Sequence, residues 1–150
     1  MKRHVIVLFA IATVASTYAV SALAAKKEKP ADRVVVIYFH RTQRCPTCLK
    51  MGSYTEQAVK KAFAKQLKEG VVEFFLVDYQ AKKNVALAKA YKVAEPALII
   101  AKVKSNKVKE YKNLKDIWVK VREKSQFMKY VCDNVDAYLA RGLRLQDGRL

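Results

Sequence analysis

Cysteine and histidine are scarce in this sequence: its 150 residues include three cysteines and two histidines. Two of the cysteines form a Cys-x-x-Cys motif, Cys45 and Cys48, and such a pair can supply half of the ligands of a zinc site. The other half would have to come from Cys132, His4 and His40, and His4 lies in a segment that we expect to be removed. This shortage of ligands argues against a structural zinc site.

The sequence also lacks any flavin or nucleotide fingerprint, so we expect no cofactor. It contains no internal repeat, and after residue 25 no apolar run is long enough to span a membrane. Without residues 1–24, the segment that we expect to be removed, the remaining 126 residues fit a single domain, and we expect no stable membrane span.

The first 24 residues have the pattern of a secretory signal. Residues 2–4 are basic, residues 5–20 are apolar and small, and residues 22–24 read Ala-Leu-Ala, a small-x-small cleavage pattern. The alternative is a retained N-terminal anchor, but the apolar run includes polar residues at 16 and 17 and is short for a span of about 20 residues. The sequence therefore predicts a signal peptide over residues 1–24 and a periplasmic or secreted protein.

Basic residues outnumber acidic ones by 30 to 13, a net charge of +17. Residues 1–24 carry two basic and no acidic side chains, so cleavage leaves 28 basic against 13 acidic residues, a net charge of +15. Export argues against nucleic acid as a partner and favours an acidic partner protein or an anionic surface. Alternatively, the lysines form a solvated face, because apart from residues 102–112 they are dispersed along the chain.

The Cys-x-x-Cys motif follows an apolar run over residues 34–39, in a strand–loop–helix setting that is typical of a redox dithiol. Cys45 would lie at a helix N-terminus, where unpaired N–H groups and the helix dipole favour a thiolate. Pro46 suits the first helical turn, and Arg41 and Arg44 add positive charge. The alternative is a structural disulfide, but so small a ring restrains the unfolded chain little.

Apolar periodicity and turn residues predict an α/β fold with a central mixed sheet of about four strands, helices on both faces and an extra C-terminal helix. The expected strands cover residues 34–39, 71–78, 97–103 and 108–111, the first two of them buried, and a turn at Ser105-Asn106 makes the last an antiparallel edge. The expected helices cover residues 46–69, the segments capped by Asn84 and Asn113, and about 125–142. Residues 25–32 are a linker, 33–142 the domain and 143–150 a flexible tail.

Two segments give the chain a resemblance to thioredoxin-like proteins. One is the strand, loop and Cys-x-x-Cys of residues 34–48, and the other is residues 91–100, Tyr-Lys-Val-Ala-Glu-Pro-Ala-Leu-Ile-Ile. The second resembles the thioredoxin segment in which a cis-proline precedes the third core strand and faces the dithiol. The resemblance implies a thioredoxin-like fold, and it implies that Pro96 is cis and lies next to Cys45 and Cys48.

The sequence also resembles a narrower family, small exported bacterial proteins labelled ArsF-type nitrophenyl compound nitroreductase subunits. The residues that carry this resemblance are 38–40, 44–48, 112–114 and 118–127, and the similarity covers roughly residues 34–139. It implies the same fold and the same cysteine pair. We do not expect the nitroreductase activity, which normally needs a flavin.

The motif departs from thioredoxin in two respects. The residues between the cysteines are Pro-Thr rather than Gly-Pro, and the preceding strand contains no carboxylate. His40 ends that strand and is a candidate proton shuttle, or else a loop residue held by hydrogen bonds. Glutaredoxins also use Cys-Pro-x-Cys, but their glutathione-binding segment is missing after Pro96, so we expect no dependence on glutathione. We interpret Cys132 as a buried, inert thiol and Trp118 as a core residue.

The sequence thus predicts an exported thiol–disulfide oxidoreductase that acts on protein thiols and disulfides of the cell envelope. Cys45 attacks, Cys48 resolves the mixed disulfide and Pro96 shapes the docking groove. Two alternatives remain open. One is copper handling by the same cysteines with His40 as a third ligand, and the other is a redox-inert adaptor.

Overall fold

The computed structural model describes residues 29–146, with side chains up to Arg141, and its centre is a four-stranded sheet. The strands are β1 (Arg33–His40), β2 (Val72–Asp78), β3 (Ala97–Lys104) and β4 (Lys107–Asn113), in the spatial order β2-β1-β3-β4. β1 is parallel to β2 and antiparallel to β3, and β3 is antiparallel to β4. The predicted mixed four-stranded sheet is confirmed.

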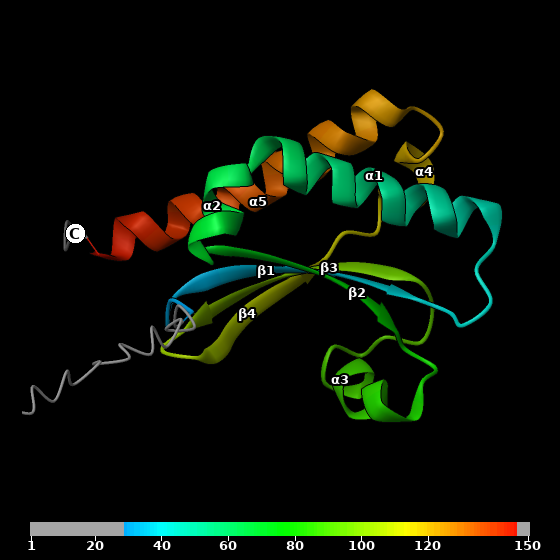
Figure 1. Ribbon diagram of the computed structural model, residues 1–150, viewed down its shortest axis with the longest axis horizontal. Helices are drawn as coiled ribbons and strands as arrows, with labels where there is room; N and C mark the ends of the chain where they lie inside the picture. Colours follow the sequence, from blue (N-terminus) through cyan, green and yellow to red (C-terminus); the bar gives the residue numbers. More distant parts are fainter. Residues whose placement is uncertain (1–28, 147–150) are drawn as a thin grey trace, which may run out of the picture.

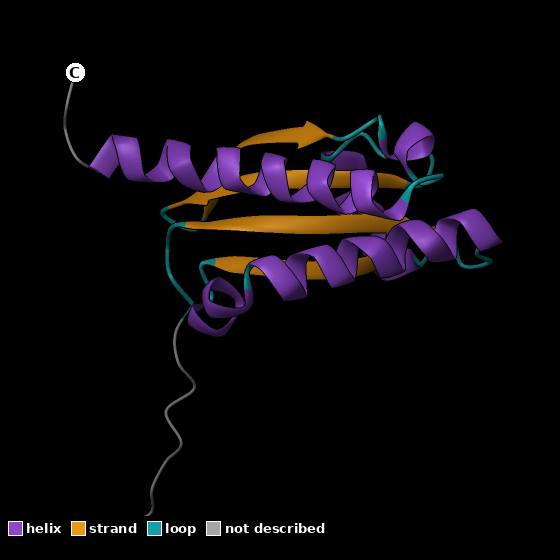
Figure 2. Ribbon diagram, turned by 90° about the horizontal axis from the view of Figure 1, so that it is seen from above, coloured by secondary structure: helices purple, strands orange, loops and turns teal. Residues whose placement is uncertain are grey.

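Helices lie against both sides of this sheet (Figure 1). The long helices α1 (Pro46–Ala62) and α5 (Lys124–Gln146) run over one face, as Figure 2 shows from above. The short helix α2 (Ala64–Glu69) leads into β2, and α4 (Ile117–Lys120) precedes α5. The short helices η1 (Lys82–Asn84) and α3 (Val85–Ala90) lie on the other side, at one end of the sheet.

Alternate residues of β1 divide the core into two clusters. Val34, Val36 and Tyr38 pack with residues of α1 and α5, whereas Val35, Ile37 and Phe39 pack with Tyr91 and β3. Both sets are buried. β1 is therefore a central strand covered on both faces, which explains why its sequence is continuously apolar.

The segment predicted as one helix over residues 46–69 is two helices, α1 and α2, separated at Phe63. This residue leaves the helical conformation (φ −121°, ψ 31°) while its side chain stays in the core, 2% exposed. Burial of the large ring offsets the loss of helical geometry. The predicted stop at Gly70 is confirmed, because its φ of 77° is in the left-handed region that glycine adopts without strain.

β2 differs from the buried strand that was predicted. It lies at an edge of the sheet, and Phe75 and Leu76 are 41% and 43% exposed. An apolar run alone does not distinguish an edge strand from a central one. The hairpin between β3 and β4 is confirmed, with positive φ at both Ser105 and Asn106.

Three helix assignments also need correction. Asn84 makes no capping bond and donates instead to the Asp78 carbonyl (2.8 Å). Asn113 ends β4 rather than capping a helix, and the helix that follows, α4, is only four residues long. Trp118 on this helix is 42% exposed, so the prediction that it belongs to the core is wrong. α5 continues to Gln146, so the tail does not begin at residue 143; Gly142 weakens a helix without ending it.

The end of the predicted linker is attached to the domain. Ala31 accepts a hydrogen bond from the Asn106 amide (3.0 Å), and Asp32 accepts one from the Ser105 amide (2.8 Å). The predicted signal peptide, the first half of the linker and residues 147–150 lie outside the described residues. Within residues 29–146, no helix is long and apolar enough to cross a membrane.

Candidate functional site

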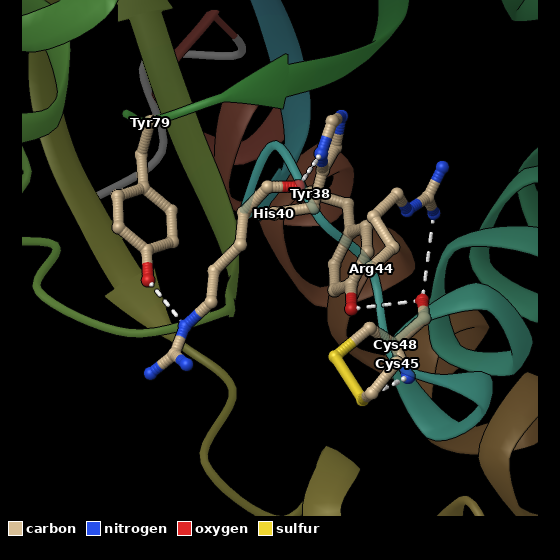
Figure 3. Close-up of a disulfide and its surroundings, with 7 residues drawn as sticks. Tyr38, His40, Arg44, Cys45, Cys48 and Tyr79 are labelled. Atoms are coloured by element: carbon tan, nitrogen blue, oxygen red, sulfur yellow. Dashed lines mark hydrogen bonds between the residues drawn. A yellow bond between two sulfur atoms is a disulfide. The ribbon is translucent and has the colours of Figure 1, made fainter. Parts of the chain in front are cut away.

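The two motif cysteines form a disulfide at the beginning of α1 (Figure 3). β1 ends at His40, and four loop residues lead to Cys45, which is the N-cap residue of α1. The Cys45 sulfur accepts a hydrogen bond from the Cys48 amide (3.2 Å), and Pro46 occupies the first turn. The Cys45 sulfur thus satisfies a helix N–H that would otherwise lack a partner within the helix.

The two cysteines differ in accessibility. Cys45 is exposed, whereas Cys48 lies one turn into the helix and is only 4% exposed. An incoming partner therefore reaches the Cys45 sulfur first. This difference in exposure agrees with the predicted roles of Cys45 as the attacking and Cys48 as the resolving cysteine, and those roles stay predictions.

Tyr38 lies beneath the first turn of α1. Its side chain is fully buried, and its hydroxyl donates a hydrogen bond to the Cys48 carbonyl (3.0 Å). Burial raises the pKa of Tyr38 to about 12, although the positive charge of Arg44 acts in the opposite direction. The hydroxyl therefore stays protonated near neutral pH and acts as a hydrogen-bond donor rather than as a base.

Arg44 lies over the same tyrosine. Its guanidinium carbon is 6.0 Å from the centre of the Tyr38 ring, and its Nη2 is 3.4 Å from the Cys48 carbonyl oxygen. Gly52, which faces them from the next turn of α1, leaves the room for this arrangement. A Cβ at residue 52 would lie 2.4 Å from Arg44 Nη2 and 3.2 Å from the Tyr38 ring.

His40 and Arg41 do not point at the sulfurs. His40 Nδ1 is 2.8 Å from the Arg41 carbonyl oxygen, so this hydrogen bond requires the ring proton on Nδ1. Figure 3 shows the imidazole of His40 directed away from the disulfide. The Arg41 Nε donates a hydrogen bond to the Tyr79 hydroxyl (3.0 Å). His40 is thus held at the end of β1 by a hydrogen bond to the loop, which agrees with one of its two predicted roles. Its other predicted role, as a proton shuttle, stays a prediction.

The loop between β1 and α1 is joined to the loop that follows β2. Thr42 donates through its hydroxyl to Asp78 (2.7 Å) and through its amide to the Gln80 side chain (3.0 Å), and the Gln80 amide donates back to Asp78 (2.9 Å). The hydrogen bond from Thr42 is the main cause of a lowered pKa at Asp78. This network restrains the chain just before the cysteines.

Pro96 lies at the same end of the sheet as the dithiol, because the pairing of Phe39 with Ala97 brings the start of β3 next to the end of β1. It is buried. However, all peptide bonds of residues 29–146 are trans, so the prediction of a cis Pro96 is wrong. A bend over residues 94–96 turns the chain into β3 with the trans isomer, which is the favoured one for X-Pro bonds.

Cys132 lies on α5, away from the motif. It is partly buried, and its sulfur is 3.9 Å from the Ala58 carbonyl oxygen on α1. Burial, followed by the nearby carboxylates of Asp136 and Asp133, raises the pKa of the Cys132 thiol above its ordinary value of 9.0. A thiol with a raised pKa is a weak nucleophile near neutral pH, which agrees with an inert role.

The structure has no preformed copper site that joins His40 to Cys45 and Cys48. Within residues 29–146, no group of three or more His, Cys, Asp or Glu side chains is placed to hold a metal ion. In the disulfide form described here, the sulfurs of Cys45 and Cys48 are bonded to each other.

Sequence reasoning missed the side chains around the dithiol. Tyr38 was predicted only as part of the apolar strand over residues 34–39, and no role was predicted for Gly52. Gly52 carried a signal, since a glycine inside a helix often marks a close approach of another group. Thr42 and Asp78 gave no such signal, because their contact depends on how two distant loops meet.

No protein-family model matches the chain, and no curated protein matches its sequence. Among solved structures, one described as "Structure of a malarial protein" is similar at 20% identity, covering 61% of this chain and 96% of that chain, with a TM-score of 0.38. This likeness is too low to establish the fold family or the function.

Proposed function

We propose that the protein is an exported thiol–disulfide oxidoreductase with a thioredoxin-like fold. The observation that carries the proposal is the asymmetry of the cysteine pair: Cys45 is exposed and caps α1, whereas Cys48 is buried one turn later. An accessible attacking sulfur next to a shielded resolving sulfur is the arrangement that dithiol exchange requires.

The reaction proceeds in two exchanges. In the first, the Cys45 thiolate attacks a sulfur of a partner disulfide, so the partner's S–S bond breaks and a mixed disulfide forms while one partner thiolate leaves. In the second, Cys48 loses its proton and attacks the Cys45 sulfur, which releases the second partner thiol. Two electrons pass to the partner, and an external dithiol returns the Cys45–Cys48 disulfide to the reduced form.

The fold supports this proposal without a cofactor. The chain follows the order strand, Cys-x-x-Cys, helix, and the start of β3 with Pro96 lies at the same end of the sheet. The signal-like residues 1–24 favour partners in the cell envelope. The 28 basic and 13 acidic residues that remain after cleavage, a net charge of +15, favour acidic proteins among them. The pairing of Cys45 with Cys48 makes the protein independent of glutathione and flavin.

Turnover of a disulfide in a small protein substrate tests the proposal, with an external dithiol as reductant and without glutathione or flavin. Cys45→Ser abolishes turnover because the attacking sulfur is lost. Cys132→Ser, the matched control on α5, leaves the rate nearly unchanged. A wild-type protein that binds Cu(I) tightly at Cys45 and Cys48 but shows no turnover would support copper handling instead. An inactive protein that binds no metal would support the adaptor.

A further inference from the structure

Arg44 occupies a slot that only a glycine leaves open. Its guanidinium lies on the Tyr38 ring, with Nη2 3.4 Å from the Cys48 carbonyl oxygen. Any side chain at residue 52 would displace it, since even a Cβ would come within 2.4 Å of Nη2. The slot is therefore formed by Tyr38 of β1 and Gly52 of α1, and Arg44 of the loop between them occupies it.

Two unfavourable features coincide in this slot. Arg44 Nε is buried and has no hydrogen-bond partner among residues 29–146, although an unpaired buried donor costs free energy. Gly52 lies inside α1, where glycine is about 1 kcal/mol less favourable than alanine. The close approach of the Arg44 guanidinium and the Tyr38 ring, rather than a turn, accounts for glycine at residue 52. Where local rules are broken together next to reactive groups, a functional reason is the economical explanation.

We infer that Arg44 is a positioning residue that stabilises the reduced form of the Cys45–Cys48 pair, an inference that rests on the proposed function. Reduction by an external dithiol breaks the S–S bond and supplies two electrons and one proton, which leaves a thiolate on Cys45 and a thiol on Cys48, while the external dithiol becomes a disulfide and releases its other proton to water. The fixed positive charge of Arg44 at the first turn of α1 favours that thiolate, in addition to the helix N-terminus. The uncharged disulfide gains nothing comparable. Arg44 therefore makes the pair a stronger oxidant.

The test is the redox equilibrium of the purified protein with oxidised and reduced dithiothreitol, measured by alkylation and mass. Arg44→Met shifts this equilibrium toward the disulfide by about tenfold, which is about 30 mV. The same variant raises the pH at which Cys45 ionises, followed by thiolate absorbance. Arg122→Met, which removes an exposed arginine before α5, is the matched control and changes neither quantity.

Gly52→Ala tests the slot without removing the charge. The added methyl group displaces the guanidinium, so the equilibrium shifts in the same direction as in Arg44→Met, and the double variant shifts no further than Arg44→Met alone. Because alanine favours helix, this variant also covers the case in which Arg44→Met does not fold.

Two results would overturn the inference: an Arg44→Met equilibrium equal to that of Arg122→Met, or a Gly52→Ala effect that persists undiminished without Arg44. A wild-type disulfide that does not exchange with dithiothreitol at all would overturn the proposed function as well. If the wild type exchanges with dithiothreitol and one of the first two results is found, the inference about Arg44 fails and the proposed function does not.

Discussion

Removing the hydroxyl of Tyr38 measures what the contact beneath the dithiol contributes to stability. In Tyr38→Phe the ring still fills its buried site, and only the 3.0 Å hydrogen bond to the Cys48 carbonyl is lost. That oxygen keeps the contact with Arg44, so it is not left unpaired. We therefore expect a loss of about 0.5–1.5 kcal/mol in the free energy of unfolding. Tyr38→Ala also empties the ring's volume and costs about 3–5 kcal/mol.

Urea unfolding of the oxidised protein gives both values, provided that the denaturant slope is unchanged. Tyr54→Phe is the matched control, because Tyr54 packs on the Phe127 ring and none of the hydrogen bonds described within residues 29–146 involves its hydroxyl. A Tyr38→Phe variant as stable as the control would show that the hydroxyl contributes nothing. A variant as unstable as Tyr38→Ala would show that the hydroxyl, rather than the packing of the ring, dominates.

Three further results are expected. Alkylation near neutral pH modifies Cys45 long before Cys132, whose thiol has a raised pKa, and mass spectrometry of peptides from the reduced protein would reveal a reversed order. Thr42→Val raises the pKa of Asp78 toward 3.8 in an NMR titration, and an unchanged titration would exclude the hydrogen bond. Because the pKa of Asp78 is lowered in the folded protein, the contribution of this carboxylate to the free energy of unfolding is complete above pH 3.8 and is lost as the pH falls through the folded pKa. Gly70→Ala forces a side chain into φ 77° and lowers the unfolding free energy by about 1–2 kcal/mol, whereas equal stability in urea would contradict the left-handed turn.

The parts of the fold that local sequence specifies were predictable. The apolar run of β1, the stop at Gly70 and the turn at Ser105-Asn106 each follow from residues within a few positions of one another. The break at Phe63 and the exposure of Trp118 did not, because each depends on which surface the neighbouring elements leave available. Periodicity identifies an apolar face but not the element that covers it.

The candidate site divides in the same way. Cys45 and Cys48 were evident from the sequence, since a strand followed by Cys-x-x-Cys and a helix is a pattern of neighbouring residues that is typical of a redox dithiol. The slot that Tyr38 and Gly52 form for Arg44 was not evident, because it brings three segments together through tertiary packing. The isomer of the bond before proline 96 was inferred from resemblance, and resemblance does not determine a local conformation in this chain.

If Cys45 attacks and Cys48 resolves, the mixed disulfide between Cys45 and a partner can be trapped. Cys48→Ser, reduced and then incubated with a small disulfide-containing protein, should accumulate a covalent complex joined through Cys45, because the resolving thiol is missing. Peptide mass spectrometry locates the bond, and the complex should disappear on adding a reductant. Absence of the complex, or an equal yield of complex from Cys45→Ser, would contradict the claim.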